Sequence, residues 1–179
     1  MLEYTEYDKG VFSGFNTDRR VTVYRGQKTW DPEMVITANS LRRSGGSLHE
    51  REAWTMALLT QFRSNIAGAM RGEQESRERL EDMLLHAQQM PFPNPFVSCS
   101  FSTATARYYA NAGDILTSEG PWYSGMDFEF VRKLFGFYGG PFSSLQEYGL
   151  PERLQSPFTL ARVDKVEPWR PVQEEKVFP

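Results

Sequence analysis

Hydrophobic and polar residues alternate over residues 19–27, RRVTVYRGQ, where valines are separated by polar and aromatic side chains. This period of two is typical of a short β-strand. A helix is predicted to start directly afterwards, because Asp31 can cap a first turn that contains Pro32 and Glu33. The beginning of the chain is therefore predicted to be a strand followed by a helix.

Residues 49–90 have the spacing of two amphipathic helices separated by Gly72. The apolar residues of the first helix are Trp54, Leu58, Phe62 and Ile66, and those of the second are Leu80, Met83, Leu84 and Ala87. We expect both helices to pack on the core with their charged faces in solvent. The alternative is a helical hairpin that binds a partner.

Short strands and helices are also predicted in the second half of the chain. The strands are residues 94–102, 144–148 and 158–166. The helices are residues 103–113 and 126–140, and the second of them carries Phe128, Val131, Leu134 and Phe135 on one face and ends at Gly139-Gly140. This order of elements favours an α+β fold, with strand pairing that is not simply βαβ.

The length and composition suit one globular domain spanning residues 1–179, with 40% hydrophobic residues and a net charge of −3. This charge argues against general binding to nucleic-acid phosphates. A single cysteine forms no internal disulfide, so a reducing compartment is suitable. No apolar run approaches the ~18 residues of a membrane span, and the first residues lack the features of an export signal. We expect a soluble, monomeric domain with no membrane partner.

Several common catalytic patterns are missing from the sequence. The two histidines, His49 and His86, have no second metal ligand at useful spacing, so we expect no metal site. The sequence contains neither a glycine-rich phosphate loop nor a G-x-S-x-G motif. Cys99 lies within a predicted strand and is expected to be a small buried residue rather than a nucleophile.

Three short segments combine residue types that suit a binding site. Arg25, followed by Gly26, ends an apolar strand and could contact a phosphate or form a surface ion pair. Ser98 and Ser100 lie on a strand, where their hydroxyls either satisfy the backbone or orient a catalytic carboxylate. Glu147 lies on a short strand before a glycine turn, where an acidic residue is usually an exposed edge charge. Taken singly, each segment has a structural explanation.

Taken in order, these segments resemble a known family. The stretches VYRGQ, FVSCSFSTATARYYA and LQEYGLPERL are similar to the three motifs of the mono-ADP-ribosyltransferases of the Arg-Ser-Glu class. That class includes cholera-like and pertussis-like toxins and many bacterial effector domains. The resemblance implies two small split sheets that form a cleft for NAD, the co-substrate, with the helical section at about 45–90 packed on one side.

The resemblance also implies roles for individual residues. Arg25 would hold the phosphate–ribose side of NAD, where Gly26 lets the ligand approach the backbone. Ser98 would hydrogen-bond the nicotinamide ribose and the catalytic glutamate, and Ser100 would support the strand. Glu147 would bind the ribose 2′-hydroxyl and stabilise positive charge while the bond to nicotinamide breaks.

Other positions leave alternatives open. Either Tyr108 or Tyr109 could form an aromatic wall against the nicotinamide. The central threonine of the family's serine motif is replaced by Cys99, a small change. The position two residues before the catalytic glutamate, which is Glu or Gln in many members, is Leu145, so an arginine side chain is a doubtful acceptor. A shifted alignment would make Glu152 the catalytic acid instead of Glu147.

The function expected from the resemblance is transfer of ADP-ribose to a macromolecule, with release of nicotinamide. The chain would be a toxin domain of a bacterial effector, exported by a carrier or a specialised secretion system, acting in the cytoplasm of a target cell and blocked by an immunity protein. An NAD glycohydrolase, a non-catalytic binding module on the same fold and a helical adaptor are the alternatives. The acceptor is expected to be protein, although a basic rim could favour nucleic acid locally. This rim would comprise Arg42, Arg43, Arg51, Arg63 and Arg71.

Overall fold

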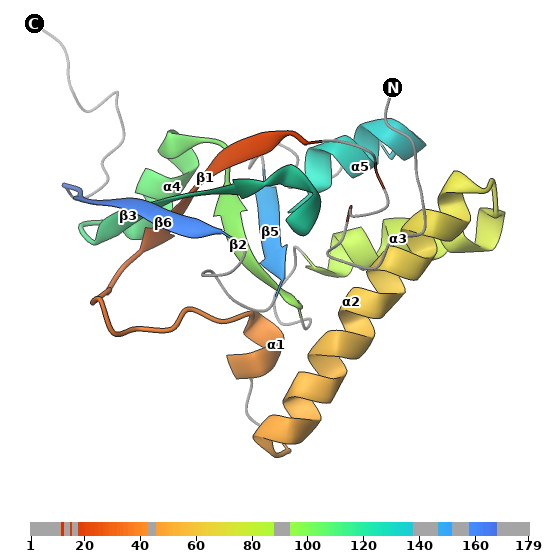
Figure 1. The fold of residues 1–179 in the computed structure, drawn as a ribbon, viewed down its shortest axis with the longest axis horizontal. Helices are drawn as coiled ribbons and strands as arrows, with labels where there is room; N and C mark the ends of the chain where they lie inside the picture. Colours follow the sequence, from red (N-terminus) through yellow and green to blue (C-terminus); the bar gives the residue numbers. More distant parts are fainter. Residues whose placement is uncertain are drawn as a thin grey trace, which may run out of the picture.

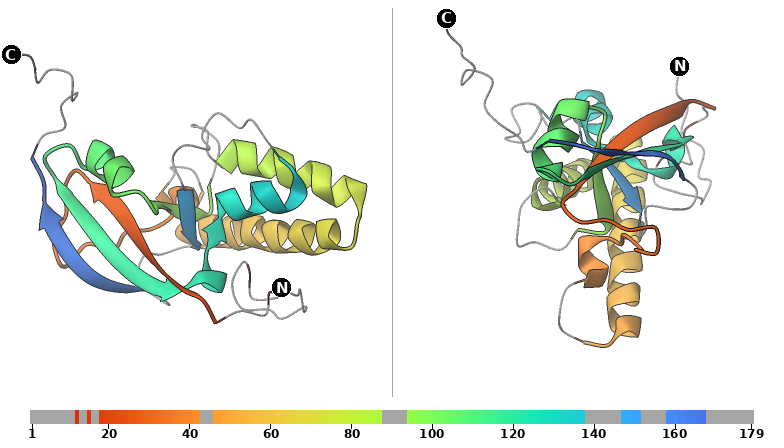
Figure 2. Two further views of the ribbon diagram at one scale, coloured as in Figure 1. Left: turned by 90° about the horizontal axis from the view of Figure 1, so that it is seen from above. Right: turned by 90° about the vertical axis from the view of Figure 1, so that its left-hand side faces the viewer.

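The computed structural model describes residues 12, 15, 18–42, 46–87, 94–137, 147–151 and 158–167. Helices and a six-stranded sheet are combined in one molecule, which confirms the α+β class. Figure 1 shows the sheet beside the long helix α2, and Figure 2 shows the strands β1, β3 and β6 at one end and the helices α2, α3 and α5 at the other.

The sheet consists of two halves that meet at one point. Its strand order is β4-β5-β2-β1-β3-β6, and all neighbouring strands are antiparallel. The strands are β1 (Arg20–Gln27), β2 (Phe96–Ser100), β3 (Asp114–Pro121), β4 (Met126–Asp127), β5 (Glu147–Pro151) and β6 (Thr159–Lys165). β1 pairs with β3 over its whole length, whereas it pairs with β2 only through Tyr24 and Ser100. The strands therefore form one continuous sheet with a narrow junction, rather than two separate sheets.

The predicted helical section is confirmed as an antiparallel pair. The helices of the structure are α1 (Asn39–Arg42), α2 (Leu48–Met70), α3 (Gln74–Ala87), α4 (Thr103–Ala110) and α5 (Phe128–Phe135), with a 3₁₀ turn, η1 (Trp122–Ser124). A reciprocal capping box between Ser47 and Glu50 starts α2. Arg77 of α3 donates a hydrogen bond to the carbonyl of Phe135 at 2.8 Å, which attaches α3 to the end of α5.

The buried face of α2 differs from the predicted stripe at its beginning. Phe62 and Ile66 are buried as predicted, but Trp54 is 41% exposed, and Thr55 and Leu59 occupy the buried face in its place. Residues at strict steps of four drift around a 3.6-residue helix by about 40° per step. Residues spaced by exactly four that face the core at one end of a long helix therefore turn toward solvent at the other end.

The helix predicted at Asp31 is wrong. Asp31 Oδ1 accepts a hydrogen bond from the Glu33 amide at 2.8 Å, and the Met34 amide donates to the Asp31 carbonyl at 3.0 Å. These bonds close a single turn, after which Val35 is exposed. Capping chemistry alone does not extend a helix when no apolar face follows it.

Strand β3 was not predicted, because it lacks an alternating pattern. Its residues from Ile115 to Ser118 are all buried. Ile115 packs beneath α4 with Ala106 and Ala110, whereas Leu116 joins the main core. A strand covered on both faces has no reason to alternate polar and apolar residues.

Element ends also differ from the predictions. Helix α5 ends at Gly136, which has a φ of 72°, instead of at Gly139-Gly140. Strand β5 starts at Glu147, and residues 144–146 of the predicted strand lie outside the described residues. The predictions for the strands β1, β2 and β6 and for the helices α3 and α4 are confirmed, with small differences at their ends.

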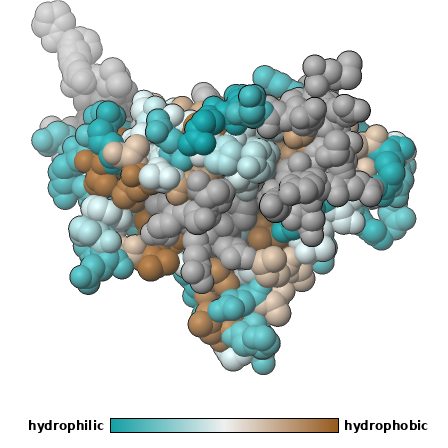
Figure 3. Space-filling model, viewed as in Figure 1, coloured by the Kyte–Doolittle hydropathy of each residue, from teal (hydrophilic) through white to brown (hydrophobic). Residues whose placement is uncertain are grey.

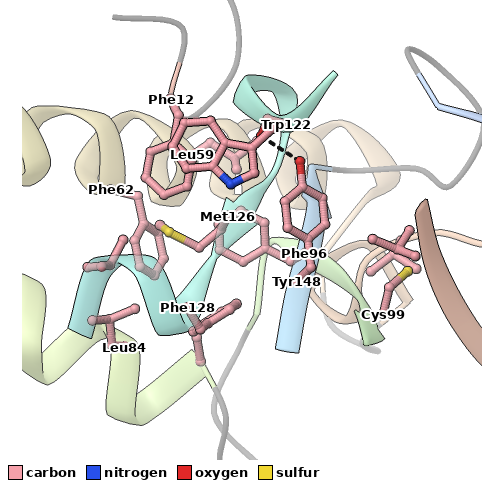
Figure 4. Packing of buried hydrophobic residues seen from close by; sticks show 14 of the residues in the cluster. Phe12, Leu59, Phe62, Leu84, Phe96, Cys99, Trp122, Met126, Phe128 and Tyr148 are labelled. Atoms are coloured by element: carbon pink, nitrogen blue, oxygen red, sulfur yellow. Dashed lines mark hydrogen bonds between the residues drawn. The ribbon is translucent and has the colours of Figure 1, made fainter. Parts of the chain in front are cut away.

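An aromatic core holds the strand that carries Glu147. Trp122 stacks on Phe12 with their ring centroids 4.6 Å apart. The hydroxyl of buried Tyr148 donates to the Trp122 carbonyl at 2.6 Å and accepts from the Gly125 amide at 2.9 Å (Figure 4). Buried polar groups must be paired in this way, so these bonds fix β5 against η1.

The surface mixes polar and apolar residues. Figure 3 shows apolar residues beside polar ones near the end of the molecule formed by α1 and the start of α2, a region that includes the exposed Leu48. Within the described ranges, no helix is long and apolar enough to cross a membrane.

Candidate active site

A cleft of about 510 Å³ lies where β1 and β2 separate. Its walls come from β1 and the following turn, α1, β2, α4 and the start of β5. The volume falls within the range of about 300–1,000 Å³ that is typical of small-molecule sites. Arg25, Ser98 and Glu147, which are far apart in the sequence, all line this cleft.

Arg25 occupies the point where the strand pairing stops. Its Nη1 donates to the Ser98 carbonyl at 2.8 Å, and its Nε donates to Gln27 Oε1 at 3.0 Å. The guanidinium thus satisfies a carbonyl that the interrupted β1–β2 ladder leaves without a strand partner. Burial lowers the pKa of Arg25, and the nearby positive charge of Arg42 acts in the same direction. An arginine remains charged under such conditions, so Arg25 brings a fixed positive charge to the cleft.

Gly26 also lines the cleft, and its missing side chain has a packing reason. A Cβ atom at this position would lie 2.0 Å from the Ala106 carbonyl oxygen and 2.6 Å from the Ala110 amide nitrogen. Both atoms belong to the backbone of α4, so only glycine lets this helix approach β1 closely.

Ser98 and Glu147 are joined by a hydrogen bond. Ser98 Oγ donates to Glu147 Oε1 at 3.0 Å. Glu147 lies opposite Ser100 in the β2–β5 register. Ser98, two residues before Ser100, lies on the same face of β2, because side chains alternate along a strand. Ser98 is exposed, whereas Glu147 is only 8% exposed. The serine therefore presents an oriented carboxylate to the cleft.

Ser100 shapes the turn from β2 into α4. Its Oγ accepts a hydrogen bond from the Ser102 amide at 2.9 Å, and the Ser102 side chain accepts from the Thr105 amide at 3.3 Å and so caps α4. The succession of hydroxyls in this segment thus has a local structural purpose as well as a place in the cleft wall. Ser100 itself is buried and also lines the cleft.

Cys99 borders the cleft, but its side chain alternates to the other face of β2 from Ser98 and Ser100. It lies opposite Tyr148 in the strand register and belongs to the apolar core, as Figure 4 shows. Burial raises the pKa of its thiol to about 12, so the thiolate is scarce at physiological pH. Its chemistry is that of a small apolar residue.

Tyr109, rather than Tyr108, lines the cleft. It shares a face of α4 with Thr105 and Ala106, which also line the cleft, because residues three and four positions apart lie together on a helix. Tyr108 packs edge-to-face on Tyr109 with the ring centroids 5.2 Å apart.

Helix α1 supplies Asn39, which the sequence did not indicate, and Arg42, which was predicted only as part of a basic rim. Asn39 and Arg42 line the cleft, as does Lys28 after β1. The Asn39 Oδ1 atom is buried and finds no hydrogen-bond partner among the described residues. A four-residue helix carries no recognisable motif, so only the folded chain shows that these residues face Arg25.

Several residues named in the sequence predictions lie outside the part of the chain that the structure describes. Glu152, Leu145, Gln146 and Arg43 lie outside the described residues. Of the remaining residues of the proposed basic rim, Arg42 lines the cleft. Arg51 and Arg63 belong to α2, and Arg71 is the C-cap of that helix. A rim of this composition is therefore not a single feature of the cleft wall.

Comparison with known proteins adds no family to this geometry: no family model matches the chain, and no curated protein matches it. In the part of the chain that the structure describes, no group of three or more His, Cys, Asp and Glu side chains could hold a metal ion. The arrangement itself combines a buried carboxylate, a serine hydroxyl and an arginine at one end of a cleft. Such a site can bind anionic and hydroxyl-bearing ligands and can stabilise a developing positive charge.

Proposed function

We propose that this chain is an NAD-dependent mono-ADP-ribosyltransferase, which transfers ADP-ribose to a macromolecular acceptor and releases nicotinamide. The observation that carries the proposal is the hydrogen bond from Ser98 to Glu147, inside a cleft that Arg25 also lines. Three residues that the family resemblance singled out come from three strands and lie in one cleft.

The chemistry requires a fixed negative charge beside the ribose. When the glycosidic bond breaks, its electron pair leaves with neutral nicotinamide, and positive charge develops on the sugar. The oriented carboxylate of Glu147 stabilises this charge in the transition state more than in the ground state. The acceptor then forms the new bond to the same carbon and loses its proton. Removing one such preorganised group costs about 2.7–4 kcal/mol, or roughly a hundred- to a thousandfold in rate.

The cleft also suits the remaining parts of NAD. Arg25, Arg42 and Lys28 place positive charge around it, which favours a pyrophosphate despite the negative net charge of the whole chain. The buried Asn39 Oδ1 atom needs a hydrogen-bond donor, and NAD carries such donors in its ribose hydroxyls and its amino groups. Tyr109 would provide the aromatic wall.

The test is release of nicotinamide from NAD by the purified chain. Glu147→Gln is expected to lower the rate about a hundred- to a thousandfold. Glu119→Gln makes the same change at an exposed residue of β3 and should leave the rate unchanged. Loss of turnover in Glu152→Gln alone would move the catalytic acid to Glu152. Absence of both turnover and NAD binding in the unmodified chain would refute the proposal.

The acceptor separates a transferase from an NAD glycohydrolase, for which water is the acceptor. We expect labelled NAD to modify material in a cell lysate, and the label to be removed by protease rather than by nuclease. Nicotinamide release without any labelled macromolecule would identify a glycohydrolase. Toxicity on expression inside a cell, suppressed by a protein that blocks the cleft, is expected if the chain is an effector toxin with an immunity protein.

A further inference from the structure

Arg132 is a buried arginine in α5 that does not line the cleft. It is only 8% exposed, and buried arginines normally interact with negative charges. Burial lowers its pKa, while the negative charges of Glu129 and Glu147 raise it. Arg132 is therefore a candidate partner for the acid that we assign to catalysis, and the geometry of α5 and β5 decides whether it can reach it.

The strand register places α5 beside Glu147. Asp127 of β4 pairs with Tyr148 of β5. The next residue along β4, Phe128, begins α5, and the residue before Tyr148 is Glu147. The helix therefore starts next to Glu147, and Arg132 follows about one turn later.

Hydrogen bonds hold this helix and strand β5 to the same turn. Asp127 caps α5 by accepting from the Phe130 amide at 3.1 Å, and its other oxygen accepts from the indole of Trp122 at 3.0 Å. The hydroxyl of Tyr148 donates to the carbonyl of Trp122 at 2.6 Å. Because Trp122 anchors both elements, the distance between α5 and β5 is fixed by buried polar contacts.

We propose that Arg132 is a positioning residue, which keeps the Glu147 carboxylate ionised and oriented from outside the cleft. The catalytic role of Arg132 rests on the proposed function, but its effect on the ionisation of Glu147 is measurable without NAD. Burial strips water from Glu147 and favours the uncharged acid, which cannot stabilise a positive charge. A buried guanidinium nearby opposes this effect.

The other charged groups near Glu147 do not act in the same way. Cys99 on β2 interacts with Glu147, but its thiol stays neutral near pH 7. Arg25 on β1 and Arg42 on α1 line the cleft itself, where they can engage a bound anion. Glu129 on α5 raises the pKa of Arg132 and is not a cation. Arg132 is thus a buried cation of α5 that does not line the cleft.

The experiment follows the titration of Glu147 by carbon NMR of glutamate-labelled protein without NAD, with its signal assigned from Glu147→Gln. In Arg132→Met, we expect the midpoint to move to higher pH by about one to three pH units. Arg132→Lys keeps the charge and should move it less. Lys133→Met removes a neighbouring exposed charge from the same helix and should leave it unchanged, because water screens that charge. An unchanged midpoint in Arg132→Met would overturn the proposal.

Nicotinamide release then tests the catalytic part. The acid limb of the pH–rate profile should move to higher pH in Arg132→Met, so that activity lost at pH 6 returns at higher pH. Arg132→Lys should restore the activity at pH 6. An equal loss at every pH would show a merely structural role and refute the inference. If Arg132→Met does not fold, Arg132→Gln is compared with Arg132→Lys: the Glu147 midpoint should lie at higher pH in Arg132→Gln, and equal midpoints would overturn the proposal. The NMR titration remains valid even if the unmodified chain has no activity on NAD.

Discussion

The hydroxyl of Tyr148 is expected to be a major support of the site, and Tyr148→Phe tests this directly. The ring is fully buried and Phe fills the same space, so the substitution leaves no cavity. It does leave the Gly125 amide and the Trp122 carbonyl without the partner that lies 2.9 Å and 2.6 Å away, respectively.

Each buried polar group left unpaired costs about 1–3 kcal/mol, or about 2–6 kcal/mol for the two. Because the Gly125 amide still reaches the Trp122 carbonyl at 3.5 Å, we expect the free energy of unfolding to fall by about 2–4 kcal/mol. For a chain of this size, the melting temperature should fall by about 4–16 °C. Urea denaturation and calorimetry measure the two quantities. Tyr109→Phe makes the same change at a half-exposed residue and should alter stability by less than about 0.5 kcal/mol. Equal stability of Tyr148→Phe and Tyr109→Phe would show that these buried hydrogen bonds do not hold β5.

Two other substitutions or treatments test the site and its opposite face. Ser98→Ala removes the hydrogen bond to Glu147, and bonds to charged groups contribute about 1.5–3 kcal/mol. The melting temperature should therefore fall by about 3–12 °C, and nicotinamide release about ten- to a hundredfold because the carboxylate is no longer oriented. A normal rate would contradict the role given to Ser98. Cys99 should resist iodoacetamide at pH 8 in the folded chain and react in urea, because burial raises the pKa of its thiol to about 12. The thiol of the unfolded chain loses its proton first as the pH rises, so the free energy of unfolding should also decline above about pH 9. Rapid alkylation of the folded chain would place Cys99 outside the core.

Local signals predicted much of the fold. The alternation in β1 and the spacing of α2 and α3 are confirmed, because each pattern reflects one buried face. The same reasoning failed for β3, which is buried on both faces, and for Asp31, whose capping side chain closes only a turn. In both cases, contacts with residues far apart in the sequence determined the secondary structure, and the local pattern of residues did not.

The sequence singled out Arg25, Ser98 and Glu147 only through the order of three short segments that resemble one family, because each segment alone has a structural explanation. Only the tertiary structure decided that they line one cleft, since this depends on the β2–β5 register and on the separation of β1 from β2 after one pair. The partners of this site, Asn39 in α1 and Arg132 in α5, carry no local signal at all. Their positions are set by contacts between segments far apart in the chain, which no short pattern of residues encodes.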